Sequence, residues 1–213
     1  MKPLLKLDKL KVIDDAVNIW NTIDHSTENN LDIKFFRQAS KTMGHYSLGK
    51  KTKRWDDFRE NFKPLTDESC LIEFYVGNKE NYVSNPHTDR GRTVAINIPI
   101  KVDLNNSTAF FGKHFDLSEY PAPSSRQKYT FDISTKETEF KAETNTRYLG
   151  EYNENFYDHV DLDCPVLFNP AVPHGGWNKS NDSRVLMSLS FDSMTYEQAY
   201  NKCVELGWTS EIS

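Results

Sequence analysis

One stretch decides the fold, residues 164–191, which reads CPVLFNPAVPHGGWNKSNDSRVLMSLSF. It begins with a short apolar run and turns through two prolines and a pair of glycines. Between Arg184 and Phe191, one set of alternate positions is mostly small or polar and the other set is wholly apolar. Because side chains alternate between the two faces of a strand, this period of two predicts a β-strand with one buried face. The stretch therefore predicts two strands joined by turns.

The middle of the chain has the same character. Residues 93–100 also divide into a small or polar set and an apolar set of Val and Ile. The apolar face would pack on helices, while the polar face would line a cavity or face solvent. Turn-rich segments separate the strand-like ones, which predicts an antiparallel sandwich or barrel. The predicted strands are 70–76, 93–102, 109–115, 129–133, 165–168 and 184–191.

Both ends of the chain favour helices. Apolar residues recur three and four apart in 14–24, 31–43 and 50–63, which predicts three N-terminal helices. Thr195 and Gln198 form a capping box that begins a C-terminal helix. We therefore predict one mainly β domain over residues 1–213. It would have a helical segment at 1–66, a β core at 67–193 and a C-terminal helix at 194–213.

The composition limits the function. Thirteen Phe, ten Tyr and four Trp among 213 residues can fill a large core, so a disordered chain is excluded. A net charge of −5 disfavours a dedicated nucleic-acid binder. No apolar run reaches the roughly 18–20 residues of a membrane span, and the first residues do not resemble a signal peptide. Three cysteines without a Cys-x-x-Cys pair indicate reduced thiols, so we expect a cytoplasmic protein.

Two histidines have neighbours that indicate chemistry. His87 and Asp89 are two residues apart, so in a strand both side chains point to the same face. His174 follows a strand-like run and two prolines, and Arg184 comes ten residues later. Two His and one Asp form the ligand set that holds one face of a non-haem Fe(II). Alone, the His-x-Asp pattern is weak, because an Asp in a turn beside a surface His gives the same letters. His159 and Asp161 form a competing pair with no strand-sized segment before them.

These residues also carry a family resemblance, over roughly residues 70–191. The chain resembles the 2-oxoglutarate/Fe(II)-dependent dioxygenases, in particular small prolyl-hydroxylase-like members from bacteria and phages. The resemblance implies a double-stranded β-helix (jelly roll), and a hydroxylation that uses Fe(II), 2-oxoglutarate and O2. It implies that His87, Asp89 and His174 bind the iron, and that Arg184 binds the distal carboxylate of 2-oxoglutarate. The remaining similarity lies in Tyr75, Gly77, Arg92-Thr93, Asn97 and the run LFNPAVPHGG.

Arginine suits the role that the resemblance gives to Arg184. A buried carboxylate needs a permanently charged partner, and the planar guanidinium can donate two parallel hydrogen bonds to it. A surface arginine after a polar turn is the alternative. Asn97 and Ser188 lie on the polar faces of their predicted strands, and we expect them to share the cosubstrate pocket. Candidates for the substrate rim, chosen by closeness in sequence, are Arg90, Arg92, Arg126 and Trp177.

The chain departs from the family at two positions. Leu186 occupies the place of a common serine, and Ser190 occupies the place of a second arginine found in nucleic-acid demethylases. The second departure argues against DNA or RNA repair. Asp89 is intact, which favours hydroxylation over halogenation.

The primary substrate is not indicated by the sequence. A peptidyl proline, another amino-acid side chain and a small metabolite all remain open, and the oligomeric state is not indicated either. Two other classes also remain open. One is a cupin-like jelly roll that binds a metal without oxidative turnover, and the other is a purely structural β-sandwich.

Overall fold

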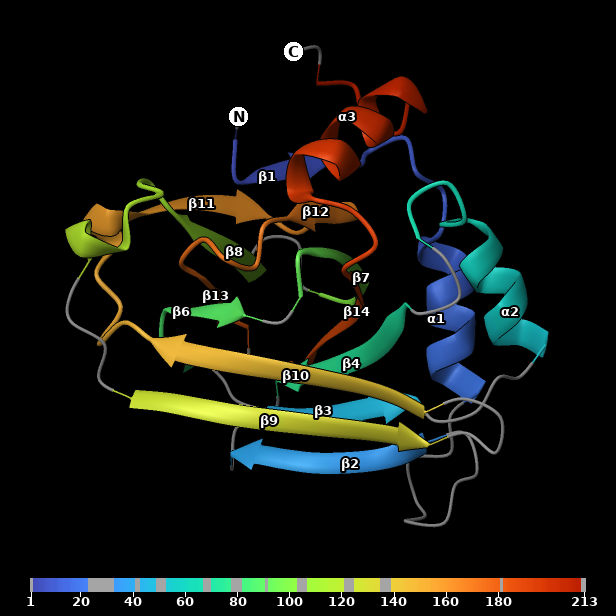
Figure 1. Cartoon of the computed structure of the whole chain (residues 1–213), viewed down its shortest axis with the longest axis horizontal. Helices are drawn as coiled ribbons and strands as arrows, with labels where there is room; N and C mark the ends of the chain where they lie inside the picture. The colour runs from blue at the N-terminus through green and yellow to red at the C-terminus, as the bar shows by residue number, and fades with distance from the viewer. Residues whose placement is uncertain are drawn as a thin grey trace.

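The computed structural model describes most of the chain, in eleven ranges. These are residues 2–22, 33–40, 43–48, 53–66, 70–77, 82–90, 92–102, 107–120, 125–134, 139–180 and 182–211. Within them the protein is mainly β, with two antiparallel sheets and a few helices, as predicted. Figure 1 shows the two sheets, with α1 and α2 beside each other at one side of the molecule.

The first sheet has the order β1-β12-β7-β14-β4-β3-β2. Its strands are β1 (Leu4–Lys6), β12 (Val166–Phe168), β7 (Val94–Lys101), β14 (Arg184–Phe191), β4 (Leu71–Gly77), β3 (Met43–Leu48) and β2 (Ile33–Ser40). The second sheet has the order β11-β8-β13-β6-β10-β9, and β5 pairs with β13. Its strands are β11 (Tyr157–Asp161), β8 (Ser107–Gly112), β13 (His174–Asn178), β6 (His87–Arg90), β10 (Glu139–Tyr148), β9 (Ser125–Ser134) and β5 (Tyr82–Val83).

The chain crosses repeatedly from one sheet to the other. β6 lies in the second sheet, β7 in the first and β8 in the second, and β11 to β14 alternate in the same way. This alternation makes the two sheets a jelly roll. It also places β6 beside β13 in the second sheet and β7 beside β14 in the first, so the sequence-predicted site residues come from adjacent strands.

The helix predicted over residues 31–43 is wrong. Ile33–Ser40 forms the strand β2, which pairs antiparallel with β3, and β3 in turn pairs with β4. The four-residue spacing of the apolar positions imitated a helix. However, Ile and Phe also favour strands, and the exposed edge of β4 offers backbone partners that a local pattern does not reveal. The segment 1–66 therefore contains strands as well as helices.

The other helix predictions are confirmed with shorter bounds. The helices are α1 (Ile13–Thr22), α2 (Lys53–Glu60) and α3 (Tyr196–Glu205). α3 begins with the predicted capping box, because the Gln198 backbone N–H donates to Thr195 Oγ1 and the Thr195 backbone N–H donates to Gln198 Oε1. None of the helices in the described ranges has the length and apolar character that a membrane crossing requires.

The apolar face of the first sheet forms the main core with the helices. Ile96 and Ile98 on β7 and Met187 on β14 are fully buried in one cluster with Ala16 and Ile19 of α1. Each such side chain contributes about 1.5–3 kcal/mol by leaving water. The opposite faces of β7 and β14 point between the two sheets, which is where the candidate site lies.

Candidate metal and cosubstrate site

Three sequence-predicted ligands meet at one end of the space between the sheets. His87 begins β6 and His174 begins β13, and the two residues are paired across these adjacent strands. Asp89 lies two residues along β6, on the same face as His87. One ligand atom from each of the three lies within 4.8 Å of the others, and the two imidazole centroids are 4.5 Å apart. The described residues contain no second such cluster of three.

Backbone carbonyls fix the orientation of both imidazoles. His87 Nδ1 lies 2.8 Å from the carbonyl oxygen of Asn85, and His174 Nδ1 lies 2.8 Å from that of Val172. Because a carbonyl oxygen only accepts, each Nδ1 must carry its proton and donate it. Each Nε2 then keeps its lone pair available for a metal ion.

The charges at the site suit a divalent cation. Burial, together with the neighbouring His174, lowers the pKa of His87 to about 4, so its imidazole is neutral near pH 7. Burial opposes ionisation of Asp89, but the charge of Arg92, together with the adjacent His174, outweighs it and holds the pKa of Asp89 well below its usual value. The neutral His87 imidazole and the Asp89 carboxylate are deprotonated ligands that are ready to bind a metal ion.

Arg92 supports this ligand set directly. Its Nη2 forms an ion pair with Asp89 Oδ2, and its Nη1 donates to Ser190 Oγ at 2.8 Å. Sequence proximity suggested Arg92 as a substrate-rim residue. The structure instead places its guanidinium against the candidate metal ligand, although the side chain also lines the cavities on both sides of it.

A small cavity of about 150 Å³ extends from the imidazoles to Arg184. This volume is below the roughly 300 Å³ at which pockets for drug-sized ligands begin, so it suits a small metabolite. Asn97 and Ser188 both line it, as the strand alternation predicted. Its described walls comprise Tyr75, Gly77, Ser84, His87, Arg92, Asn97, Ala109, Phe111, Phe168, His174, Gly175, Gly176, Asn178, Arg184, Leu186 and Ser188.

No carboxylate of the described residues forms an ion pair with the guanidinium of Arg184. Burial alone lowers its pKa to about 10, and no carboxylate of the described residues contributes to the shift. Its Nε is buried without a hydrogen-bond partner, and its Nη1 reaches only the carbonyl oxygen of Thr108, at 3.4 Å. Ser188 Oγ, which also lines the cavity, is buried without a hydrogen-bond partner. Among the residues that the structure describes, the cavity therefore offers donors and no anion at this end.

One glycine that the sequence did not single out permits this arrangement. A Cβ on Gly176 would lie 2.2 Å from Arg184 Nη1, so any larger residue would displace the guanidinium. The sequence indicates a close contact here only through the glycine pair that directly follows His174, and a glycine pair alone also fits an ordinary turn.

Trp177, the remaining sequence-predicted site residue whose side chain the structure describes, is not brought to this cavity. Trp177 packs in an aromatic cluster with Tyr152 and His159, outside the described walls of the cavity. The side chains of Arg90 and Arg126 lie outside the described part of the structure. His159 on β11, from the competing His-x-Asp pair, contacts the hydroxyl of Tyr152, which precedes that strand.

Comparisons with known proteins give weak similarities only. The chain matches no family model and no curated protein. HygX from Streptomyces hygroscopicus, solved with nickel and 2-oxoglutarate bound, is 8% identical, with 91% of this chain and 85% of that chain covered and a TM-score of 0.46. A prolyl-4-hydroxylase from Pseudomonas putida is 10% identical, with 90% and 93% covered and a TM-score of 0.45.

Non-catalytic proteins are similar at a comparable level. An 11S globulin from Wrightia tinctoria is 8% identical, with 75% of this chain and 31% of that chain covered and a TM-score of 0.39. The chain spans between 31% and 62% of the length of this globulin and of four other matched structures. Similarities of this strength do not assign an activity, which has to come from the site.

Proposed function

We propose that this protein is a non-haem Fe(II) and 2-oxoglutarate-dependent oxygenase that hydroxylates a small molecule or a peptide. One observation carries the proposal. The small cavity meets the two imidazoles of a two-His, one-Asp ligand set at one end, and at the other a partly buried arginine that no described carboxylate compensates. A dicarboxylate that chelates a metal with one end needs a cationic partner for the carboxylate at its far end, and Arg184 is that partner.

The residues present fit both groups. His87, Asp89 and His174 would hold Fe(II) on one face and leave coordination positions open. The buried donors around Arg184, which have no partners of their own, would be satisfied by a carboxylate. Bound together, Fe(II) and 2-oxoglutarate would supply an oxidation in which 2-oxoglutarate and O2 give succinate and carbon dioxide, with one oxygen atom of O2 in succinate and the other in the hydroxylated product.

The chain's own residues bind 2-oxoglutarate, orient the metal ligands and shield the cavity from water. Arg184 fixes the distal carboxylate of 2-oxoglutarate with parallel hydrogen bonds, and Ser188 Oγ can donate another. Arg92 holds the carboxylate of Asp89, and the carbonyls of Asn85 and Val172 hold the two imidazoles. Phe111, Phe168 and Leu186 line the cavity and exclude water from it.

A cupin-like metal site without turnover explains less of the structure. It accounts for the three metal-binding side chains but gives no role to Arg184, whose Nε is buried without a hydrogen-bond partner, and an unsatisfied buried donor is costly. We also propose a cytoplasmic location, because the three cysteines are buried thiols without a Cys-x-x-Cys pair.

The proposal is tested by mixing the protein with Fe(II) and 2-oxoglutarate without oxygen. Chelation of both gives a weak visible charge-transfer band, and admitting oxygen gives slow succinate formation without any primary substrate. We expect both signals in the wild type and neither in His174→Ala. A wild-type protein that binds Fe(II) but gives no band and no succinate would support the cupin-like alternative.

A further inference from the structure

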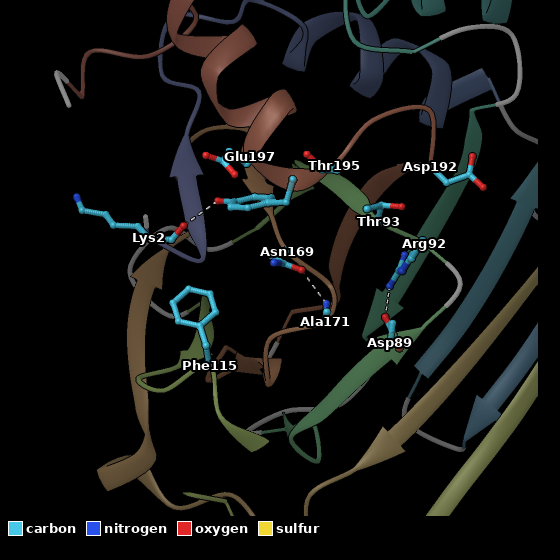
Figure 2. A pocket seen from close by; sticks show the side chains of 11 residues that line it. Lys2, Asp89, Arg92, Thr93, Phe115, Asn169, Ala171, Asp192, Thr195 and Glu197 are labelled. Atoms are coloured by element: carbon cyan, nitrogen blue, oxygen red, sulfur yellow. Dashed lines mark hydrogen bonds and ion pairs between the residues drawn. The ribbon is translucent and has the colours of Figure 1, made fainter. Parts of the chain in front are cut away.

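A second and larger cavity, of about 700 Å³, opens at the metal end of the barrel. Figure 2 shows its walls, which come from the N-terminus, the segment after β8, the β12–β13 loop and the start of α3. The hydroxyl of Tyr196 donates to the carbonyl oxygen of Lys2 at 3.1 Å and so joins the two ends of the chain beside the cavity. The lining residues are Lys2, Asp89, Arg92, Thr93, Phe115, Asn169, Ala171, Asp192, Thr195, Tyr196 and Glu197.

This cavity reaches the candidate metal site from the side opposite the cosubstrate. Asp89 and Arg92 line it, whereas Arg184 and the other cosubstrate residues do not. Its volume falls within the roughly 300–1,000 Å³ of ligand pockets. It is therefore placed and sized for a second molecule that must approach the metal while 2-oxoglutarate fills the small cavity.

One wall of the cavity is an exposed aromatic side chain. Phe115 is 60% exposed and is the one large apolar side chain that the described part of the chain leaves on the surface. Its ring points into the cavity (Figure 2), which Tyr196 also lines. An exposed phenylalanine at a cavity mouth is a marker of a binding surface, because it gains free energy when a ligand covers it.

The charge that is left uncompensated around the cavity is negative. The ammonium of Lys2 is neutralised by Glu211 at 2.8 Å, and Arg92 is paired with Asp89. The carboxylates of Asp192 and Glu197 stand at the rim on either side of the cavity (Figure 2), and no ion pair of the described residues engages them. A ligand that complements these walls has a cationic group next to an apolar part.

We propose that the primary substrate binds in this cavity and carries an amine or guanidinium beside an apolar chain. The inference rests on the proposed function and names the substrate class of that same site. The cationic group pairs with a carboxylate of the rim, Asp192 or Glu197, and the apolar chain lies on Phe115 toward Asp89. A free amine metabolite and a basic side chain within a peptide share this chemistry.

The test uses matched probes with the Fe(II)- and 2-oxoglutarate-loaded enzyme. The probes are Nα-acetyl amides of lysine, arginine, norleucine and glutamate, with free lysine and lysine-containing pentapeptides as separate arms. The readout is succinate formed with a probe divided by succinate formed without it, measured within each variant. We expect stimulation by the lysine or arginine compounds and none by norleucine or glutamate. The free-lysine and pentapeptide arms then distinguish a metabolite from a peptide.

Three variants locate the effect. Glu197→Gln or Asp192→Asn, whichever removes the paired carboxylate, is expected to raise the KM for the cationic probe about two- to fivefold, as loss of one exposed charge does. Ala171→Trp fills the cavity from an exposed position and is expected to abolish the stimulation. Asp15→Asn, an equally exposed carboxylate on α1, is the control and leaves both rates unchanged. Equal stimulation by norleucine, or full stimulation in Ala171→Trp, overturns the proposal.

A second measurement separates this proposal from the proposed function. Saturation-transfer NMR detects binding of the lysine probe to the metal-free protein, without any turnover. A signal that Ala171→Trp removes supports binding of the cationic probe in this cavity, even if no succinate is ever formed. No signal, or a signal that Ala171→Trp leaves intact, overturns binding in this cavity, even if the enzyme oxidises 2-oxoglutarate.

Discussion

Replacing Arg184 by methionine is expected to have two effects of opposite sign. Methionine fills similar space without charge, so the ligand-free protein no longer buries an uncompensated guanidinium. Burial moves the pKa of Arg184 from 12.5 to about 10, which corresponds to a cost of about 3 kcal/mol at most. Since the side chain keeps some contact with solvent, we expect Arg184→Met to raise the free energy of unfolding by about 1–2 kcal/mol. The melting temperature of the ligand-free protein rises by several degrees.

The same substitution is expected to weaken 2-oxoglutarate binding severely. The guanidinium would donate two charge-assisted hydrogen bonds to the distal carboxylate, each worth about 1.5–3 kcal/mol. Losing both raises the Kd for 2-oxoglutarate at least about 100-fold. The affinity is measured by titrating the charge-transfer band without oxygen, and the stability by calorimetry with and without 2-oxoglutarate.

Arg184→Lys is the matched control. It keeps the buried charge but loses the planar fork, so we expect no gain in stability and an intermediate loss of affinity, about tenfold. If Arg184→Met instead destabilised the ligand-free protein and left 2-oxoglutarate binding intact, the arginine would be a structural residue. The proposed cosubstrate site would then be wrong.

Three further substitutions test the neighbouring contacts. Gly176→Ala places a methyl group on Arg184 Nη1, where the Cβ would lie at 2.2 Å, so we expect about tenfold weaker 2-oxoglutarate binding with metal affinity unchanged. Arg92→Met releases Asp89, and Fe(II) affinity is expected to fall about 10- to 100-fold in an anaerobic titration; an unchanged affinity would show that the ion pair is dispensable. The pKa of His87 is about 4 in the fold and near 6.5 in an unfolded chain, so the unfolded state binds more protons between these values. The free energy of unfolding of the metal-free protein is therefore expected to fall by about 1–3 kcal/mol as the pH drops from 6.5 to 4, and His87→Gln is expected to flatten that fall in urea titrations.

The parts of the structure that sequence predicted well are those fixed by local periodicity. The alternation in residues 184–191 determines which side chains of β14 face the cavity, and Ser188 lies there as expected. The two-residue spacing of His87 and Asp89 places them on one face of β6 in the same way. The capping box of α3 needs only residues three apart, and it forms as predicted.

The parts that sequence missed depend on partners far along the chain. The sequence predicts a helix where β2 forms, because the strand that completes this part of the sheet is distant. The β2–β3 pair adds to the edge of β4, which follows α2 in the chain. The second cavity combines Lys2 with Tyr196, residues from opposite ends of the chain that are joined by one hydrogen bond. No spacing in the sequence indicates such a meeting, so Phe115 and Glu197 could not be proposed as substrate residues.

Arg92 shows that a sequence motif can give the wrong charge for a position in the folded structure. Ser190 lies six residues after Arg184, at the position where nucleic-acid demethylases usually have a second arginine. The absence of that arginine from the sequence argues against nucleic-acid repair. In the structure Ser190 Oγ accepts a hydrogen bond from Arg92, so a guanidinium does lie there, contributed by the turn before β7. The prediction that nucleic acid is not a substrate must therefore rest on other charges. Asp192 and Glu197 are those charges, because two carboxylates at the mouth of the larger cavity would repel a phosphate backbone and attract an amine.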